Sequence, residues 1–498
     1  MNANQSMSRR NFLATSGTVL AGSAIINPVS ELRAATADAS ARPAAAGKVK
    51  LAMVGTGSRG TSMWGSGLTQ QYSDRIEFVG LCDMNPGRVE AGKEIIRANC
   101  PTYSDLANPM GAFEKMIRET KPDLLIVTTV DATHNEYIVR GMELGVNVIT
   151  EKPMTTDEKK VQQILDAEKR TGKKTRVTFN YRYSPHRAKM WELLRAGEIG
   201  DLTSVDFHWY LDTRHGADYF RRWHRLVEKS GSLWVHKASH HFDLLNWWID
   251  SDPETVYALG SLDFYGKNGK FRAENCRTCP HTAECQFYFQ LERPAMSAAM
   301  QDAAGVRRPG GQAAQSFVSP YRRLYIDCEK YDGYLRDGCV FKNDINIFDK
   351  MAATIKYANG VQVSYSLTAY SPYEGYRIAF NGTKGRMDAW IQESNPTQDR
   401  DYDEIVLYKN FSRRQYIQVS NGSSGHGGGD NLLRDQIFIP NTPDPYKQCA
   451  GTRDGSFACL IGIAARNSIA SGQPVKIADM TSLKPQAQKA YQRDILDM

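Results

Sequence analysis

The segment Lys50–Gly60 constrains the fold more than any other part of this chain. An apolar run leads straight into a G-x-G-x-x-G pattern at Gly55, Gly57 and Gly60. The first glycine permits a tight turn, the second lets a pyrophosphate approach the backbone, and the third lets the next helix pack closely. Because N–H groups at a helix N-terminus attract anions, the sequence predicts a dinucleotide-binding turn that includes Ser58 and Arg59.

A second strand is expected over Ile76–Leu81 and ends in Cys82-Asp83. Asp83 lies 23 residues after Gly60, where an acidic side chain binds the adenosine ribose hydroxyls in such folds. This carboxylate favours NAD as the cofactor. Arg88 lies nearby, so NADP stays open as the second candidate.

Strands and helices alternate after this turn. Helices are expected from Asn85-Pro86 to about Ala98, over His134–Leu144 and over Asp157–Arg170; strands are expected over Asp123–Thr129, Val146–Thr150 and Arg176–Phe179. This alternation is typical of a doubly wound parallel sheet. The sequence therefore predicts a Rossmann domain over residues 48–180.

Beyond Tyr181 the pattern becomes polar–apolar alternation. A helix over His186–Ala196 precedes alternating runs at Leu202–Leu211, Ala352–Tyr357, Val361–Ala369, Tyr376–Asn381, Glu404–Tyr408 and Gln415–Val419. Such alternation is typical of antiparallel strands with one solvated or helix-covered face. We therefore expect an α/β domain with a large, mostly antiparallel open sheet over residues 181–455, and a C-terminal helix and tail over 456–498.

The first residues resemble an export signal. Ser8-Arg9-Arg10-Asn11-Phe12-Leu13 precedes a modestly apolar run, and Ala35-Thr36-Ala37 is the expected cleavage site. Paired arginines before such a run are typical of twin-arginine signals. We therefore expect a signal peptide over residues 1–37, a flexible lead-in over 38–47 and a periplasmic location.

Composition narrows the function classes. The 498 residues carry a formal charge of +7, without a basic stripe that alternates with aromatic residues. Nucleic acid is therefore not an expected partner. No later segment is apolar over the length that a membrane helix needs.

Three of the nine cysteines are closely spaced, at Cys276, Cys279 and Cys285, within an insertion expected over residues 262–345. Thiolates at such spacing bind structural zinc, whereas export favours disulfides. Unpaired structural cysteines are the third alternative, and all three stay open.

Glu151-Lys152-Pro153 follows the strand expected over Val146–Thr150. Ligands of open α/β sheets bind at the carboxyl ends of the strands, so Lys152 is expected in the nicotinamide and substrate crevice. With the other motifs, this triplet resembles the glucose–fructose oxidoreductase/inositol dehydrogenase (Gfo/Idh/MocA) family. The matching motifs are the glycine turn, Cys82-Asp83, His134, Asn180-Tyr181-Arg182 and His240-His241-Phe242-Asp243.

The resemblance implies hydride transfer at a secondary hydroxyl of a sugar, cyclitol or sugar derivative, and a homo-oligomer. By this resemblance Lys152 orients the hydroxyl, and His240 is the general acid/base, a task that an imidazole pKa near 6.5 suits. Tyr181 and Arg182 join the catalytic group by the same resemblance. His134 and Glu151 join the cofactor-binding group.

The sequence departs from the family at His236, where an Asp is usual, and Lys237 follows directly. On one continuous helix, His236, His240 and Asp243 would share a face. Two interpretations follow: a cationic or hydrogen-bonding site for a carboxylate or carbonyl, or a divalent metal site on the His-x-x-x-His pair. The glycine-rich loop Gly425–Asp430 could border the substrate site.

Two other function classes remain. An NAD-dependent glycosidase or lyase, in which oxidation is transient, would use the same residues. A non-catalytic binding protein is disfavoured by the strand-end lysine and the helix histidine. Because an exported protein has no nicotinamide pool to exchange with, we expect the cofactor to stay bound through many cycles.

Overall fold

The structure is a computed structural model that describes residues 47–290, 320–394, 401–420, 422, 425–489 and 491. The expected export signal and most of the lead-in, residues 38–46, lie outside these ranges. No helix within them is both long and apolar enough to cross a membrane.

The first sheet is parallel throughout, with the strand order β3-β2-β1-β4-β5-β6. Its strands are β1 (Val49–Val54), β2 (Ile76–Cys82), β3 (Thr102–Tyr103), β4 (Leu124–Val127), β5 (Asn147–Thr150) and β6 (Thr175–Val177). The central strand β4 reads Leu-Leu-Ile-Val and is buried along its whole length, because helices cover both faces of such a sheet. The strand order reverses between β1 and β4, which is where ligands bind in this architecture.

Side-chain caps mark the start of three helices of this domain, α3 (Pro86–Ile96), α4 (Pro109–Thr120) and α6 (Glu158–Thr171). The Asn85 side chain accepts a hydrogen bond from the Arg88 N–H, and Asp157 does the same for Lys160; such caps satisfy otherwise unpaired N–H groups. The domain also contains η2 (Gly60–Ser66), which is π-helical, α2 (Gly67–Gln71) and α5 (His134–Glu143). The predicted Rossmann architecture is confirmed.

The second sheet has the strand order β14-β13-β12-β11-β7-β10-β9-β8-β15. Its strands are β7 (Leu202–Asp212), β8 (Pro253–Ser261), β9 (Lys350–Tyr357), β10 (Gln362–Ser371), β11 (Glu374–Gly382), β12 (Gly385–Ser394), β13 (Tyr402–Lys409), β14 (Gln415–Ser420) and β15 (Val475–Lys476). Only the β7–β10 pairing is parallel among the pairings that the structure describes. The expectation of a large, mostly antiparallel sheet is confirmed, although β8 and β12 were not anticipated.

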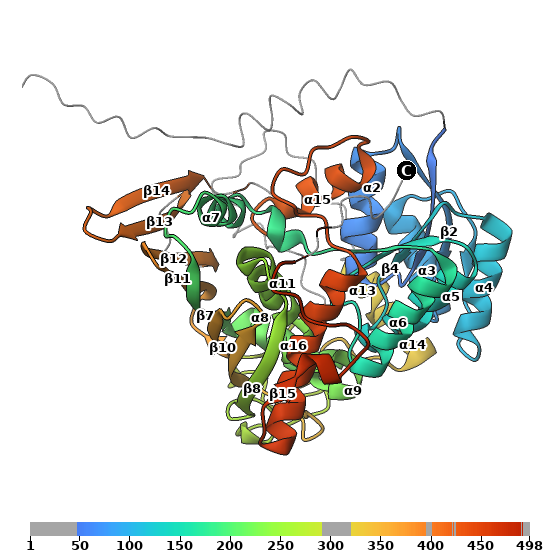
Figure 1. Ribbon diagram of the computed structural model, residues 1–498. Helices are drawn as coiled ribbons and strands as arrows, with labels where there is room; N and C mark the ends of the chain where they lie inside the picture. Colours follow the sequence, from blue (N-terminus) through green and yellow to red (C-terminus); the bar gives the residue numbers. More distant parts are fainter. Residues whose placement is uncertain are drawn as a thin grey trace, which may run out of the picture. The chain divides into compact units, whose positions relative to one another are not determined.

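The two faces of this sheet differ. Along β9 every second residue is buried, because α11 (Ala238–Ile249) and α16 (Thr452–Ser471) pack on that side (Figure 1). The other face carries large exposed side chains, namely Tyr257, Leu259, Trp390, Tyr408 and Tyr416. Period-two alternation places these residues opposite the helices.

Candidate functional site

The glycine turn has the geometry that a dinucleotide requires. Gly55 has φ +93°, and a Cβ there would lie 2.6 Å from the backbone of Thr128. A Cβ on Gly60 would lie 2.3 Å from the Gly55 carbonyl oxygen. At Gly57 the nearest atom to a Cβ is the Tyr325 hydroxyl at 3.5 Å, so no backbone atom crowds the turn on that side. The residues of the turn therefore fit a pyrophosphate.

Asp83 lies where β2 ends and caps this turn. Its carboxylate accepts hydrogen bonds from the Thr56 N–H at 2.8 Å and the Asn85 N–H at 2.9 Å. Arg88 donates to the same carboxylate at 3.3 Å and to Asp332 at 2.7 Å. Two carboxylates therefore already neutralise the Arg88 guanidinium, which is the group that would bind the 2′-phosphate of NADP.

Glu151 joins the glycine turn to the end of β5. Its Oε1 accepts hydrogen bonds from Arg59 Nε at 2.7 Å and from Trp64 Nε1 at 2.9 Å. His134 holds the same region from α5, since its ring nitrogens lie 2.8 Å from the Pro153 carbonyl and 3.1 Å from the Thr129 carbonyl. Both residues therefore position the Lys152 turn, whose peptide bond to Pro153 is cis.

Lys152 extends from this turn towards the second domain. Its Nζ donates a hydrogen bond to the His236 carbonyl at 3.2 Å. Burial lowers the pKa of Lys152 to about 8, although the carboxylates of Asp131 and Glu151 act in the opposite direction. An amine with this pKa can give or take a proton near neutral pH.

His236 pairs with an aspartate that the sequence argument did not include. His236 Nδ1 lies 2.5 Å from Asp131 Oδ2, and both side chains are buried. Burial lowers the pKa of His236 well below its usual value and raises that of Asp131 well above. Asp131 lies four residues after the end of β4 at Val127, so the strand-end rule that drew attention to Lys152 could have found it.

His240 lies on α11 and stacks on Tyr181, with ring centroids 4.0 Å apart. Its Nδ1 is buried and has no hydrogen-bond partner within the part of the chain that the structure describes. Burial and then the charges of Lys152 and Lys237 lower its pKa well below the usual value. His240 is therefore a neutral imidazole at neutral pH, which suits a general base.

Lys237 begins a hydrogen-bonded chain that runs towards the surface. Its Nζ lies 3.0 Å from the Tyr181 hydroxyl and 3.4 Å from Glu374. Glu374 in turn lies 2.7 Å from Nδ1 of His215, whose side chain is 40% exposed. Glu374 and His215 come from β11 and α8 (Thr213–Arg221). We call Lys152, Asp131, His236, Lys237, His240 and Tyr181 the Lys152 cluster.

Arg182 does not join this cluster, which corrects its assignment to the catalytic group. Its guanidinium is buried against Asp243 at 2.8 Å and Asp454 at 3.0 Å. These bonds tie the end of the Rossmann domain to α11 and α16. Opposite charges that are fully removed from water satisfy each other, so Arg182 has a structural role.

The shared helix face expected for His236, His240 and Asp243 is also wrong. The helix α10 (Leu233–His236) ends at His236, and α11 begins at Ala238. The three side chains contact different partners: Asp131, Tyr181 and Arg182, respectively. Among the described residues no three His, Cys, Asp or Glu side chains are placed to hold a metal ion.

The closely spaced cysteines lie near one another in the second domain. Cys276, Cys279 and Cys285 line one small cavity with Cys339, yet in the described part of the chain these four form neither a disulfide nor a metal-binding group. Cys276 Sγ instead accepts a hydrogen bond from Arg221 at 3.0 Å. Of the three alternatives, this arrangement favours unpaired structural cysteines.

The loop Gly425–Asp430 borders the Lys152 cluster, as the sequence suggested. The His426 ring lies 5.6 Å from the Tyr181 ring, and His426 Nδ1 lies 3.0 Å from Asp430. Asp430 also accepts a hydrogen bond from Asn180 at 2.5 Å. His426 therefore stands at the edge of the cluster and can contact a substrate there.

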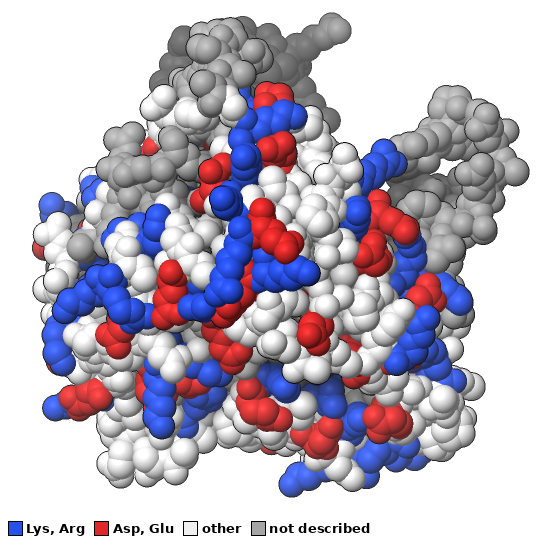
Figure 2. All heavy atoms as spheres, turned by 90° about the vertical axis from the view of Figure 1, so that its right-hand side faces the viewer, with Lys and Arg blue, Asp and Glu red and all other residues white. Residues whose placement is uncertain are grey.

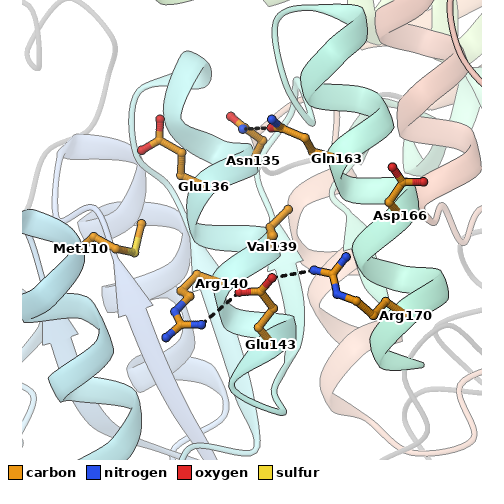
Figure 3. Close-up of a pocket in the computed structure, with 9 residues that line it drawn as sticks. All are labelled: Met110, Asn135, Glu136, Val139, Arg140, Glu143, Gln163, Asp166 and Arg170. Carbon is orange, nitrogen blue, oxygen red and sulfur yellow. Dashed lines mark hydrogen bonds and ion pairs between the residues drawn. The ribbon is translucent and has the colours of Figure 1, made fainter.

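A separate surface hollow of 440 Å³ lies among α4, α5 and α6 (Figure 3). Three of its charged side chains pair with one another, because Glu143 binds Arg140 at 3.0 Å and Arg170 at 2.6 Å. It shares no residue with the Lys152 cluster. Basic and acidic side chains are interspersed across this side of the molecule (Figure 2). Neither the hollow nor this mixed surface indicates a binding site, so the Lys152 cluster remains the candidate site.

Comparisons with known proteins agree with this geometry. Residues 49–179 match the model "Oxidoreductase family, NAD-binding Rossmann fold", and residues 191–477 match "Oxidoreductase family, C-terminal alpha/beta domain". A Bacillus subtilis protein named as an oxidoreductase, YteT, is 36% identical over 446 residues, covering 86% of this chain and 98% of YteT.

Two further relatives differ in the activity that their names state. Glycosyl hydrolase family 109 protein 2 of Akkermansia muciniphila is 27% identical over 219 residues, which is 39% of this chain and 45% of that protein. The structure of a levoglucosan dehydrogenase with NADH and levoglucosan superposes with a TM-score of 0.57 at 17% identity. That match covers 86% of this chain and all of the other, and at this identity it shows the fold alone.

Proposed function

Because the chain belongs to the Gfo/Idh/MocA family of NAD(P)-dependent oxidoreductases, we propose that it oxidises a secondary hydroxyl of a sugar, cyclitol or sugar derivative. The observation that carries this proposal is Lys152, an amine with a pKa of about 8, at the end of β5 beside His240. Two names support the substrate class: the levoglucosan dehydrogenase and the glycosyl hydrolase family 109 protein. The NADH in the levoglucosan dehydrogenase structure supports the cofactor.

Lys152, His240 and Tyr181 each have a separate role in removing the proton from the substrate hydroxyl. When bound, NAD supplies the acceptor for the hydride that leaves the carbinol carbon. The ammonium of Lys152 donates a hydrogen bond to the substrate oxygen and orients it. Neutral His240 takes the hydroxyl proton, and Tyr181 fixes its ring by stacking. Positioned acid/base groups of this kind contribute about 10²- to 10⁴-fold to the rate.

The cofactor that fits best is NAD. Asp83 presents a carboxylate at the end of β2, where it would meet the ribose hydroxyls and repel a 2′-phosphate. Arg88 would have to leave both Asp83 and Asp332 to bind that phosphate. Gly55, Gly57, Ser58, Arg59 and Gly60 complete the proposed cofactor site.

A redox-neutral glycosidase or lyase is the second candidate function. The similarity to a glycosyl hydrolase family 109 protein favours it, and transient oxidation would use Lys152 and His240 in the same way. The two functions differ in outcome, since the glycosidase releases a sugar and returns the hydride to its product.

We further propose that the protein is exported and forms a homo-oligomer. The support for export is the sequence Ser8–Leu13. The support for assembly is the exposed aromatic face of the nine-stranded sheet, which includes Tyr257, Trp390 and Tyr408. Exposed apolar faces of this kind are typical of protein interfaces.

The deciding experiment tests purified protein against a panel of sugars and glycosides while nicotinamide absorbance and released sugar are both followed. Lys152→Ala and His240→Ala should each lower turnover by about 10²-fold or more and keep the cofactor content. The matched control is Lys174→Ala, an exposed lysine paired with Glu168, which should keep full turnover. Activity that survives both site changes would refute the assignment.

A further inference from the structure

A segment of the insertion lies directly on the glycine turn. Residues 320–332 form α13 (Pro320–Leu324), the 3₁₀ turn η7 (Ile326–Cys328) and α14 (Glu329–Asp332). We call these residues the cover segment. The hydroxyl of Tyr325 accepts a hydrogen bond from the Ser58 N–H at 3.0 Å. This N–H belongs to the turn whose donors face a pyrophosphate in such folds.

The cover segment is also attached where the ribose would bind. Arg88 reaches it twice, through Nε to the Leu324 carbonyl at 3.3 Å and through Nη2 to Asp332 at 2.7 Å. The Asn85 side chain donates to the Cys328 carbonyl at 3.0 Å. The cover segment thus contacts both the glycine turn, at Ser58, and the residues that follow Asp83.

The position of the Tyr325 hydroxyl suits a negative charge. The phenol is buried, and Arg222 and Arg336 lie close to it. Burial alone would raise the pKa of Tyr325, but the two guanidinium charges and the Ser58 hydrogen bond outweigh it and lower the pKa. The hydroxyl thus accepts a hydrogen bond from Ser58 N–H, as a phosphate oxygen would, in a place that two guanidinium groups make electropositive.

We propose that the cover segment closes the dinucleotide cleft, and that Tyr325 occupies the anion position of the turn until a nucleotide phosphate displaces its hydroxyl. A nucleotide then enters or leaves only when the segment lifts from α3. This inference rests on the proposed function, because it assumes that NAD binds at the glycine turn. It gives a physical basis for retention of the cofactor through many cycles, since release requires the Arg88 contacts to break.

A disulfide between α3 and the cover segment tests the closure. A Cβ on Gly87 would lie 3.2 Å from Cys328 Sγ, close to the roughly 3 Å that separates a Cβ from the partner sulfur across a disulfide. The same Cβ would lie 2.4 Å from the ring of Tyr331, so this exposed side chain must turn aside in both the Gly87→Cys and the Gly87→Ala variants. Gly87→Cys can therefore lock the segment, and Gly87→Ala is the control with a similar steric demand.

The experiment uses the cofactor-loaded protein. Oxidised glutathione takes the two electrons and two hydrogens of the two thiols, the one introduced by Gly87→Cys and that of Cys328, and peptide mapping identifies the bridge. Release of bound NADH is then followed by fluorescence after excess NAD is added. We expect the oxidised Gly87→Cys variant to release NADH at least tenfold more slowly than Gly87→Ala, and a reductant to restore the rate.

Unchanged release with the bridge in place would overturn the proposal, as would failure of the bridge to form, because the two positions would then not be neighbours. Tyr325→Phe gives an independent test. Loss of the competing hydroxyl should tighten NADH binding about threefold or more, whereas Tyr331→Phe should not change it. A larger Kd for NADH would contradict the proposal that the Tyr325 hydroxyl occupies the anion position. Absence of any nicotinamide binding would instead refute the proposed function itself.

Discussion

His236 Nδ1 lies 2.5 Å from Asp131 Oδ2, so a buried pair joins the segment after β4 to the helix segment beside Lys152. The family resemblance implies an aspartate at the position of His236. His236→Asp alone would place two carboxylates in contact, and like charges at this distance cannot both ionise. We expect this variant to lose most activity. The double variant with Asp131→Asn should recover activity and change substrate preference, as steady-state kinetics over the sugar panel would show. A double variant no better than the single one would contradict the pairing.

The pH dependence of kcat/KM should be bell-shaped. Lys152 acts as a charged donor, and burial lowers its pKa to about 8, so activity should fall as the pH rises through about 8. His240 acts as a neutral base whose pKa burial holds below 6.5, so the acid limb should lie below pH 6.5. Lys152→Arg should remove the alkaline limb, because a guanidinium stays charged. A rate that rises through pH 8 would instead make Lys152 the base.

Arg182 should matter for stability. Removing one partner of a buried ion pair costs about 3–5 kcal/mol, so Arg182→Ala should lower the free energy of unfolding in urea by about that amount. The control is Arg118→Ala, whose exposed pair with Glu114 should be worth at most about 1 kcal/mol. Full stability combined with lost turnover would restore Arg182 to the catalytic group.

Asp83→Ala should weaken NAD binding more than NADP binding. The change removes the ribose acceptor and leaves Arg88 with one carboxylate, Asp332, instead of two. Titration of both nucleotides by fluorescence measures the ratio of their Kd values. Equal losses would show that Asp83 only caps the turn through the Thr56 N–H.

The parts of the site that the sequence predicted follow local rules. The glycine turn, Asp83 and Lys152 all lie at ends of parallel strands, and apolar runs of four to six residues locate those strands. The pattern of alternating residues also predicted the antiparallel sheet. It did not predict β8 and β12, because exposed apolar residues such as Leu259 and Trp390 interrupt the polar–apolar alternation.

The remaining parts depend on contacts between distant residues. Glu374 and Tyr325 reach the site from more than 130 residues away along the chain, with |i−j| of 137 to Lys237 and 267 to Ser58. No spacing rule links such positions. The prediction that His236 and Asp243 share a helix face was wrong for a related reason. Asp131 binds His236 and Arg182 binds Asp243, and both bonds join residues far apart in the sequence.

We expect one bound NAD to serve many catalytic cycles. The direct measurement is the number of substrate molecules converted per bound nucleotide, in protein freed of unbound nucleotide and given an alcohol with a carbonyl acceptor, or a glycoside. We predict many conversions per nucleotide without added NAD, and an unchanged nucleotide content at the end. Conversion that stops at one per nucleotide and resumes only with free NAD would contradict it.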